Sequence, residues 1–475
     1  MSTIAVVQRG LQKALLRAGL ADDRVLAGRV REEGRRMVFL LNGLIRSSRM
    51  YTSENAALES PAAELAEILS GLCELLGAVH VVLVEDQVYV NDVRLRVNPQ
   101  EQAVVVGLIS ELDRHDVGGL SFHAPLTPPA VKALARALSE PAASGRARPA
   151  LVRRIAGVGD VELSGRYRFR VRGEPAARSL RHADVVRRGA RVIREANQNL
   201  AAGRLPNPLP VRRTVIELLD SLGDDDGRAG AEPLRRHHGL RQGEQHLLAV
   251  CSLALLLARR LGLPEAARSD LGVTALLHDV GYARHAGFAA HGAAGARTLL
   301  RQRGFHEAKV RRILAVLDHH LPFAPFDGAP APSLFARILH IADDYDVLTA
   351  SRAGFSGVPP ATAQGAMWAA RGRTYDPDLM ALFVQAMGLY PPGSLLELSD
   401  KRWVVVISGG RDAERFSRPL VRVVRGEDGA AAGASVELDL FDVRSEVRPR
   451  RVLNPATHDV DLASLLETIF EGPAR

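Results

Sequence analysis

The sequence predicts a multidomain protein with a small N-terminal α/β module, an all-α central domain and a small C-terminal β appendage. The first observation is composition: the 475 residues are 47% hydrophobic and 24% charged, which is globular and excludes collagen-like, disordered and coiled-coil chains. The second is the pattern, since β-branched runs occupy 79–97 whereas residues 209–392 follow a helical period. The third is the return of strand-like runs after residue 393.

Residues 1–35 are predicted to form a helical N-terminal segment, and residues 36–140 a small α/β module. In the module a capping side chain precedes proline three times, which predicts three helix starts: Ser60-Pro61, Asn98-Pro99 and Thr127-Pro128. β-Branched runs at 79–84, 87–90 and 93–97 predict a small antiparallel sheet. The histidines of this region share no spacing, so we interpret it as a sensory or interaction module that contacts a signalling protein.

The positive charge is concentrated in residues 141–208, which are predicted as a basic linker with a strand pair and a helix. The net charge is +8, and residues 146–204 alone hold fifteen arginines and five acidic residues. Every second residue from Arg166 to Arg172 is arginine, which is the period of a strand with one cationic face. That face is either a solvated sheet edge or a contact for an acidic partner. No nucleic-acid-binding motif accompanies it, so we expect no nucleic-acid partner.

Residues 209–392 predict a domain made of helices. Residues 247–261 are apolar on every side and are followed by Gly262, which predicts a buried central helix. Further helices are expected over six ranges: 265–279, 291–303, 306–320, 332–350, 360–371 and 377–388. Residues 393–475 are predicted as a β-rich appendage and tail, with strands at 395–398, 403–407, 420–424 and 436–440.

Cysteine usage and hydropathy indicate the compartment. Cys73 and Cys251, the two cysteines, each lie in an apolar helical stretch, so neither a disulfide framework nor a thiolate zinc site is expected. The most apolar run, residues 247–258, is too short to span a bilayer, and the N-terminus lacks a secretory signal pattern. We therefore expect a cytoplasmic protein without membrane contact.

The histidines show where chemistry is expected, because ten of the fifteen lie between His237 and His340. Seven metal-ligand types fall on five predicted helices: His246, His278, Asp279, His291, His319, His320 and Asp343. Both aspartates stand among apolar residues, so their carboxylates are expected at apolar depth. A buried, unpaired carboxylate is costly, and a metal cation resolves that cost.

Imidazole and carboxylate ligands without thiolates suit iron, manganese, nickel, cobalt or zinc. The number of ligands indicates two metals that share a bridging carboxylate. Structural alternatives account for parts of the set. In the first alternative, His319 and His320 cap the C-terminal end of a helix and bind no metal. In the second, Asp343 forms an ion pair with Arg337 or Arg352.

In their order along the chain, these ligands resemble the HD superfamily of metal-dependent phosphohydrolases, specifically its HD-GYP branch. The resemblance covers roughly residues 236–390. It rests on the seven ligands and on these neighbours: Val250, Gly281, Gly295, Arg337-Ile338-Leu339, Ala342, Thr349, Arg352 and Tyr375-Asp376-Pro377.

The resemblance implies an HD-type phosphodiesterase that hydrolyses a cyclic dinucleotide, chiefly cyclic di-GMP, in bacterial signalling. It implies the following ligands: His246, His278, Asp279 and Asp343 for one metal, and His291, His319 and His320 for the other, with Asp279 as the bridge. The two divalent ions are expected to be iron or manganese. Asp279 is then also catalytic, and Arg352 would neutralise a phosphate oxygen.

The sequence also departs from the HD-GYP pattern. The histidine-aspartate motif of the family usually ends in lysine, where this chain has Tyr282, and Arg284 is a weak substitute. The glycine-tyrosine-proline signature is absent, and Gln242 stands where three-metal members have glutamate, so two metals are expected. These departures leave two alternatives: a catalytically degenerate adaptor that binds metal or nucleotide and contacts a partner protein, or a phosphohydrolase of another nucleotide.

Overall fold

The computed structural model describes residues 23–471 except 53, 85–86, 99, 143–146, 167–181, 224, 236–241, 285–286, 302–306, 325–330, 352–355, 410–413, 432–435 and 443–445. The chain divides into two compact units, one of residues 1–175, 196–213 and 297–310 and one of residues 176–195, 214–296 and 311–475. Among the described residues, no helix has both the length and the apolar character needed to cross a membrane.

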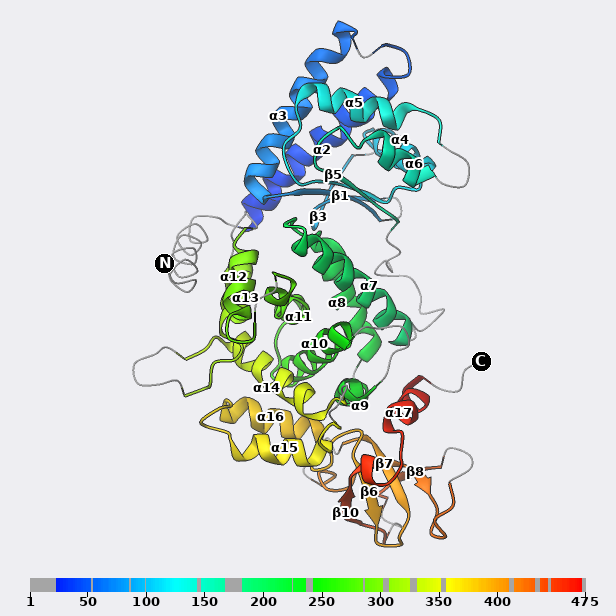
Figure 1. Ribbon diagram of the computed structural model, residues 1–475, viewed down its shortest axis with the longest axis vertical. Helices are drawn as coiled ribbons and strands as arrows, with labels where there is room; N and C mark the ends of the chain where they lie inside the picture. Colours follow the sequence, from blue (N-terminus) through cyan, green and yellow to red (C-terminus); the bar gives the residue numbers. More distant parts are fainter. Residues whose placement is uncertain are drawn as a thin grey trace. The chain divides into compact units, whose positions relative to one another are not determined.

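The first unit contains a five-stranded antiparallel sheet in the order β3-β2-β1-β4-β5. The strands are β1 (Val79–Val84), β2 (Gln87–Val90), β3 (Val93–Arg94), β4 (Gly119–Phe122) and β5 (Val161–Ser164). The helices are α2 (Asp23–Ser47), η1 (Ala56–Leu58), α3 (Glu59–Leu76), α4 (Gln102–Arg114), α5 (Pro128–Ser139) and α6 (Ala147–Arg154). Figure 1 shows the helices gathered on one side of this sheet, where Leu41, Leu69 and Leu108 are buried in a common core.

The three strands predicted between residues 79 and 97 are confirmed, although β3 ends at Arg94. Two of the predicted helix starts are wrong in position: α3 begins at Glu59, so Ser60 lies inside the helix and does not cap it, and α4 begins at Gln102. Asn98 and Glu101 still form the reciprocal hydrogen bonds of a capping box ahead of α4. The backbone N–H of Glu101 donates to Asn98 Oδ1 (2.9 Å), and that of Asn98 donates to Glu101 Oε2 (3.0 Å). Thr127 caps α5 by accepting from the N–H of Ala130.

β4 was not predicted, whereas β5 lies in residues 141–208, where a strand pair was expected. β5 comes from the basic segment, and it pairs with β4 through Leu163 and Leu120. Arg166 follows β5 and forms an ion pair with Asp113 (2.7 Å). The other positions of the predicted arginine strand, 167–172, lie outside the described residues.

The second unit is mostly helical. Its helices up to residue 388 are α7 (His182–Ala201), α8 (Pro208–Leu222), α9 (Asp226–Ala231), η2 (Glu232–Leu234), α10 (Gln242–Arg260), α11 (Glu265–Leu277), η3 (Val280–Arg284), α12 (His291–Leu299), α13 (Glu307–Asp318), α14 (Leu334–Thr349), α15 (Pro360–Ala369) and α16 (Pro377–Met387). Parts of α7, α8, α12 and α13 belong to segments of the first unit. Residues 247–258 of α10 are all buried, which confirms the predicted central helix. α10 packs against α11 and α14, and those three helices carry or precede four of the predicted ligands.

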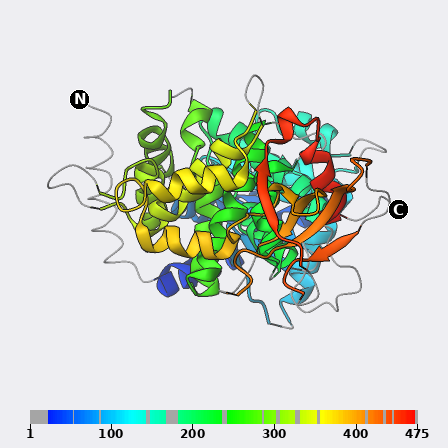
Figure 2. The same ribbon diagram turned by 90° about the horizontal axis from the view of Figure 1, so that it is seen from below.

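The C-terminal part of this unit is a second antiparallel sheet in the order β10-β6-β7-β8-β9. Its elements are β6 (Leu395–Leu398), β7 (Trp403–Ser408), β8 (Leu420–Arg425), β9 (Glu437–Asp439), β10 (Pro449–Leu453), η4 (Pro455–Thr457) and α17 (Leu462–Glu471). The four predicted strands are present, whereas β10 and α17 were not predicted. Figure 2 shows the strands and α17 in orange to red.

The appendage shares a core with the helical part of the unit. Leu395, Leu466 and Phe470 are buried with Ala231, and Leu234 packs against them. Gly393 has a φ of +85°, and a Cβ on this residue would lie 2.4 Å from Leu234 Cδ1. The positive φ favours glycine at this position, and the segment leading into β6 lies against Leu234 of η2.

Candidate metal centre

The seven predicted ligands lie together in the second unit. His246 is on α10 and Asp343 is on α14, while His291 is the first residue of α12. The other four form two adjacent pairs that directly follow a helix: His278 and Asp279 after α11, and His319 and His320 after α13. Each pair thus stands at the C-terminal end of a helix.

A close backbone approach at Gly281 brings two of these segments together. A Cβ on Gly281 would lie 1.9 Å from the carbonyl oxygen of His291. Any larger residue would therefore displace the start of α12 from η3. Gly281 thus sets the distance between the His278-Asp279 turn and His291.

Four of the histidines are held in one orientation. Nδ1 of His278, His291 and His319 donates to a backbone carbonyl oxygen three residues earlier, at Ala275 (2.7 Å), Phe288 (2.6 Å) and Val316 (2.9 Å). Nδ1 of His246 donates to Asp346 Oδ2 (2.6 Å). A proton on Nδ1 leaves a lone pair on Nε2, so all four side chains present a metal-binding nitrogen to the interior of the site.

The two aspartates lie among these nitrogens. Asp279 Oδ2 is 3.3 Å from His246 Nε2, while its Oδ1 is 3.4 Å from His291 Nε2 and 3.5 Å from His278 Nε2. Asp343 Oδ1 is 3.3 Å from His246 Nε2, and its Oδ2 is 3.6 Å from His320 Nδ1. One oxygen of Asp279 therefore faces His246 and the other faces both His278 and His291.

The charges of the site favour a bound cation. Burial alone would lower the pKa of His246, but hydrogen bonds to Asp279 and Asp346 raise that pKa to about 10. Burial opposes ionisation of Asp279, yet His278 and His246 hold the pKa of its carboxyl well below the usual range. At His319, burial together with His278 and His320 lowers the pKa well below its usual value. Asp279 thus stays ionised and His319 stays neutral, as metal ligands must be, whereas His246 has to release a proton before it can bind a metal.

The donor atoms fit metal ions better than they fit one another. His278 is fully buried, and its Nε2 has no hydrogen-bond partner among the described residues. His291 Nε2 and His319 Nε2 face each other at 3.1 Å, although each Nδ1 already holds the proton. In the described part of the chain, donor atoms lie within 4.8 Å of one another in four overlapping groups of three: His246, His278 and Asp343; His278, Asp279 and His319; His291, His319 and His320; and His320, Asp343 and Asp344. Asp344 is not among the predicted ligands.

The structure also tests the alternatives for individual residues. Asp343 does not pair with Arg337, whose guanidinium binds Asp376 (2.5 Å) instead. His319 does follow the end of α13 and bonds back to its last turn, but its Nε2 points into the cluster. Arg352 and the side chains of Arg284 and Gln242 lie outside the described residues.

One buried residue of the site was missed from the sequence. Asp346 lies one helical turn after Asp343 on α14, is 2% exposed and holds His246 through Nδ1. A carboxylate behind a ligand histidine fixes its tautomer and raises its basicity. The spacing of three residues from Asp343 on a helix was the available signal.

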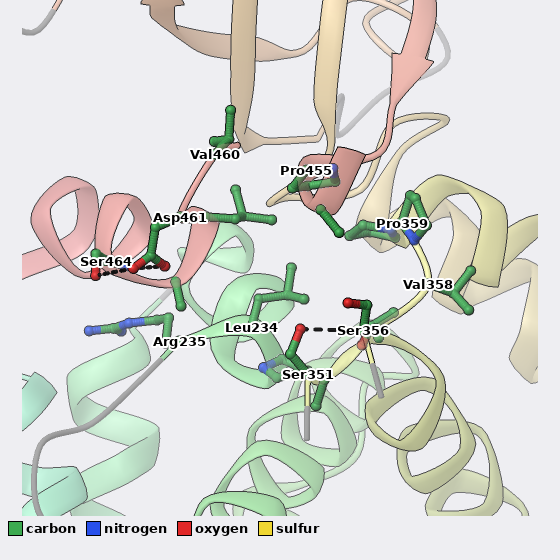
Figure 3. A pocket seen from close by; sticks show the side chains of 18 of the residues that line it. Leu234, Arg235, Ser351, Ser356, Val358, Pro359, Pro455, Val460, Asp461 and Ser464 are labelled. Carbon is green, nitrogen blue, oxygen red and sulfur yellow. Dashed lines mark hydrogen bonds between the residues drawn. The ribbon is translucent and has the colours of Figure 1, made fainter. Parts of the chain in front are cut away.

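A pocket of about 970 Å³ opens at His246 and Asp346. Its walls are η2, the segment between α14 and α15, and the C-terminal residues 454–467. Figure 3 shows Pro455 and Val460 of the C-terminal segment across from Leu234 and Ser351. The appendage therefore forms one wall of a pocket that reaches the back of a predicted ligand.

The helical fold thus brings together a histidine-aspartate cluster whose donor types suit divalent metal ions. Residues 243–348 match the family model described as HD domain. The chain thus contains an HD domain of the HD superfamily. It is 31% identical over 186 residues to the cyclic di-GMP phosphodiesterase PA4108 of Pseudomonas aeruginosa. That match covers 34% of this chain and 43% of the relative, so the chain aligns with less than half of the relative's length.

Proposed function

We propose that this protein hydrolyses a phosphodiester bond of a cyclic dinucleotide, with cyclic di-GMP as the first substrate to test. The observation that carries the proposal is the cluster in which four Nε2 atoms and two carboxylates converge while every Nδ1 is occupied. The similarity to a protein named as a cyclic di-GMP phosphodiesterase supports the choice of substrate.

In this proposal two divalent ions, iron or manganese, bind in the cluster. His246, His278, Asp279 and Asp343 would hold one ion, and His291, His319 and His320 the other, with Asp279 proposed as a ligand of both. Such a pair of ions supplies a hydroxide nucleophile at neutral pH and neutralises charge on the phosphoryl oxygens. Asp346 orients His246, and the carbonyl groups of Ala275, Phe288 and Val316 orient the other three histidines. Arg352 is proposed to bind a phosphate oxygen.

Tyr282 favours a second candidate function. It replaces the lysine expected beside the phosphate, and its ring stacks on His291 with centroids 4.3 Å apart. Without that cation, the domain would keep its metals and bind nucleotide without turnover. Such a protein would act as an adaptor that signals to a partner, for which residues 36–140 are the proposed contact. A phosphohydrolase of another nucleotide is the third candidate.

Product analysis tests the proposal. Protein purified without oxygen and loaded with Fe²⁺ or Mn²⁺ is incubated with cyclic di-GMP, and products are separated by chromatography. We expect linear dinucleotide or GMP from the wild type and none from Asp279→Asn, with circular dichroism showing that the variant is folded. Binding without product would favour the adaptor. Product from another phosphate ester in a substrate panel, but none from cyclic di-GMP, would favour the third candidate.

A further inference from the structure

Two aromatic side chains border the ligand histidines on the side of His291 and His320. The ring of Tyr282 lies parallel to that of His291, with centroids 4.3 Å apart and an angle of 8° between the planes. The centroid of Phe288 is 4.9 Å from that of His320 and 5.8 Å from that of His291. We call Tyr282 and Phe288 the aromatic ledge.

The ledge is exposed although its residue types favour burial. Phe288 is 70% exposed and Tyr282 is 42% exposed. Phe288 positions His291 through its carbonyl oxygen, a contact that any residue supplies. Its ring is therefore not needed for that contact, and its exposure excludes a role in the core.

The position of the ledge suggests what covers it. Its rings contact His291 and His320, which are two proposed ligands of the metal centre. The metal centre would hold the phosphate of the substrate, so a group attached to that phosphate would lie over the two rings. In a nucleotide, one ribose separates the phosphate from a planar base. Exposed aromatic rings bind such bases by stacking, whatever their sequence. From this juxtaposition we propose that the aromatic ledge stacks with a nucleobase of the substrate, and the inference rests on the proposed function.

The pocket on the His246 side is less suited to the base. Its described lining residues include no Phe, Tyr or Trp. They include one arginine, Arg235, which is paired with Glu232, and Asp346 is paired with His246. Three further carboxylates, Asp459, Asp461 and Glu467, disfavour a phosphate-rich ligand there. The observations therefore favour the ledge over the pocket as the place where a base binds.

A pair of ligands that differ in the base isolates the interaction. Binding of GMP and of ribose 5-phosphate to Mn²⁺-loaded protein is measured by titration calorimetry. We expect the wild type to prefer GMP. Phe288→Ala should weaken GMP binding about tenfold, because stacking contributes about that much for one base, and should leave ribose 5-phosphate within about twofold. The GMP affinity of Phe288→Leu should lie between those of the wild type and Phe288→Ala. Tyr282→Phe should still prefer GMP to ribose 5-phosphate, because it keeps the aromatic ring.

Controls separate stacking from a structural role. Tyr51 has the same 42% exposure as Tyr282 and lies in the other unit, so Tyr51→Ala should change neither affinity. The Mn²⁺ content of each variant shows whether the histidines are intact. The inference is overturned if Phe288→Ala weakens both ligands equally, if it weakens neither, or if the wild type does not prefer GMP. If the protein does not hydrolyse cyclic di-GMP but still prefers GMP to ribose 5-phosphate, the proposed enzymatic activity is overturned while base stacking on the aromatic ledge stays supported.

Discussion

Asp346 offers the sharpest test of how the centre is built, because it supports a ligand without being one of the predicted ligands. Its Oδ2 accepts from His246 Nδ1 at 2.6 Å in a buried position. Asp346→Asn keeps the shape and an acceptor oxygen but removes the charge that makes His246 a more basic ligand. Loss of such a supporting carboxylate lowers metal affinity by roughly 10- to 100-fold, or about 1.4 to 2.8 kcal/mol.

The assay is competition for Mn²⁺ with a chromophoric chelator, accompanied by metal content after dialysis. Asp378→Asn is the matched control, because Asp378 is an exposed aspartate on α16. Thermal melting of both metal-free variants verifies that the fold is retained. Wild-type metal affinity in Asp346→Asn would refute the role given to this carboxylate, as would an equal loss in Asp378→Asn.

Three further predictions follow from other parts of the structure. Metal removal should lower the melting temperature by about 5 °C or more, since a ligand at 100 times its Kd stabilises the fold by about 2.7 kcal/mol; an unchanged melting curve after chelation would contradict the fit of the cluster to metals. Gly281→Ala should lower the unfolding free energy by about 1 to 3 kcal/mol and reduce the metal content, because the new Cβ would lie 1.9 Å from the carbonyl oxygen of His291. Gly365 has open space around it, so Gly365→Ala should leave the unfolding free energy unchanged. Equal effects of the two substitutions in denaturant titrations would argue against the close approach at Gly281. Burial, together with His123, lowers the pKa of His80 to about 3, so between about pH 6.5 and pH 3 the unfolded chain binds a proton that the folded chain does not. The unfolding free energy of the first unit should therefore fall by about 2 kcal/mol between pH 6.5 and pH 5. The fall should be smaller in His80→Gln, and an equal fall in this variant would show that His80 is not the group responsible.

Local patterns were enough to predict most elements. The helix expected at 332–350 is α14 (Leu334–Thr349), and the strand expected at 395–398 is β6. Apolar spacing and capping residues specify such elements without help from distant parts of the chain. α17 also has a local pattern, because Leu462, Leu465, Leu466 and Ile469 follow helical spacing.

Other elements exist because of partners far away in the chain. β10 contains Arg450 and Arg451, which do not indicate a strand by themselves. It forms beside β6, where Glu397 binds both arginines. β5 likewise completes a sheet whose other strands come from residues 79–122. Pairing with a distant strand is a property of the tertiary structure, and no local pattern contains it.

The sequence by itself determined which residue types are available for chemistry and that an HD-type helical domain would contain them. Only the tertiary structure decided how they face one another. Asp279 directs its two oxygens to different histidines, Asp346 holds His246 from behind, and Tyr282 and Phe288 border His291 and His320. These relations join residues up to 100 positions apart in the chain, as for His246 and Asp346. Spacing along one helix cannot encode them, because they depend on the packing of α10, α11 and α14 and on the turns between helices.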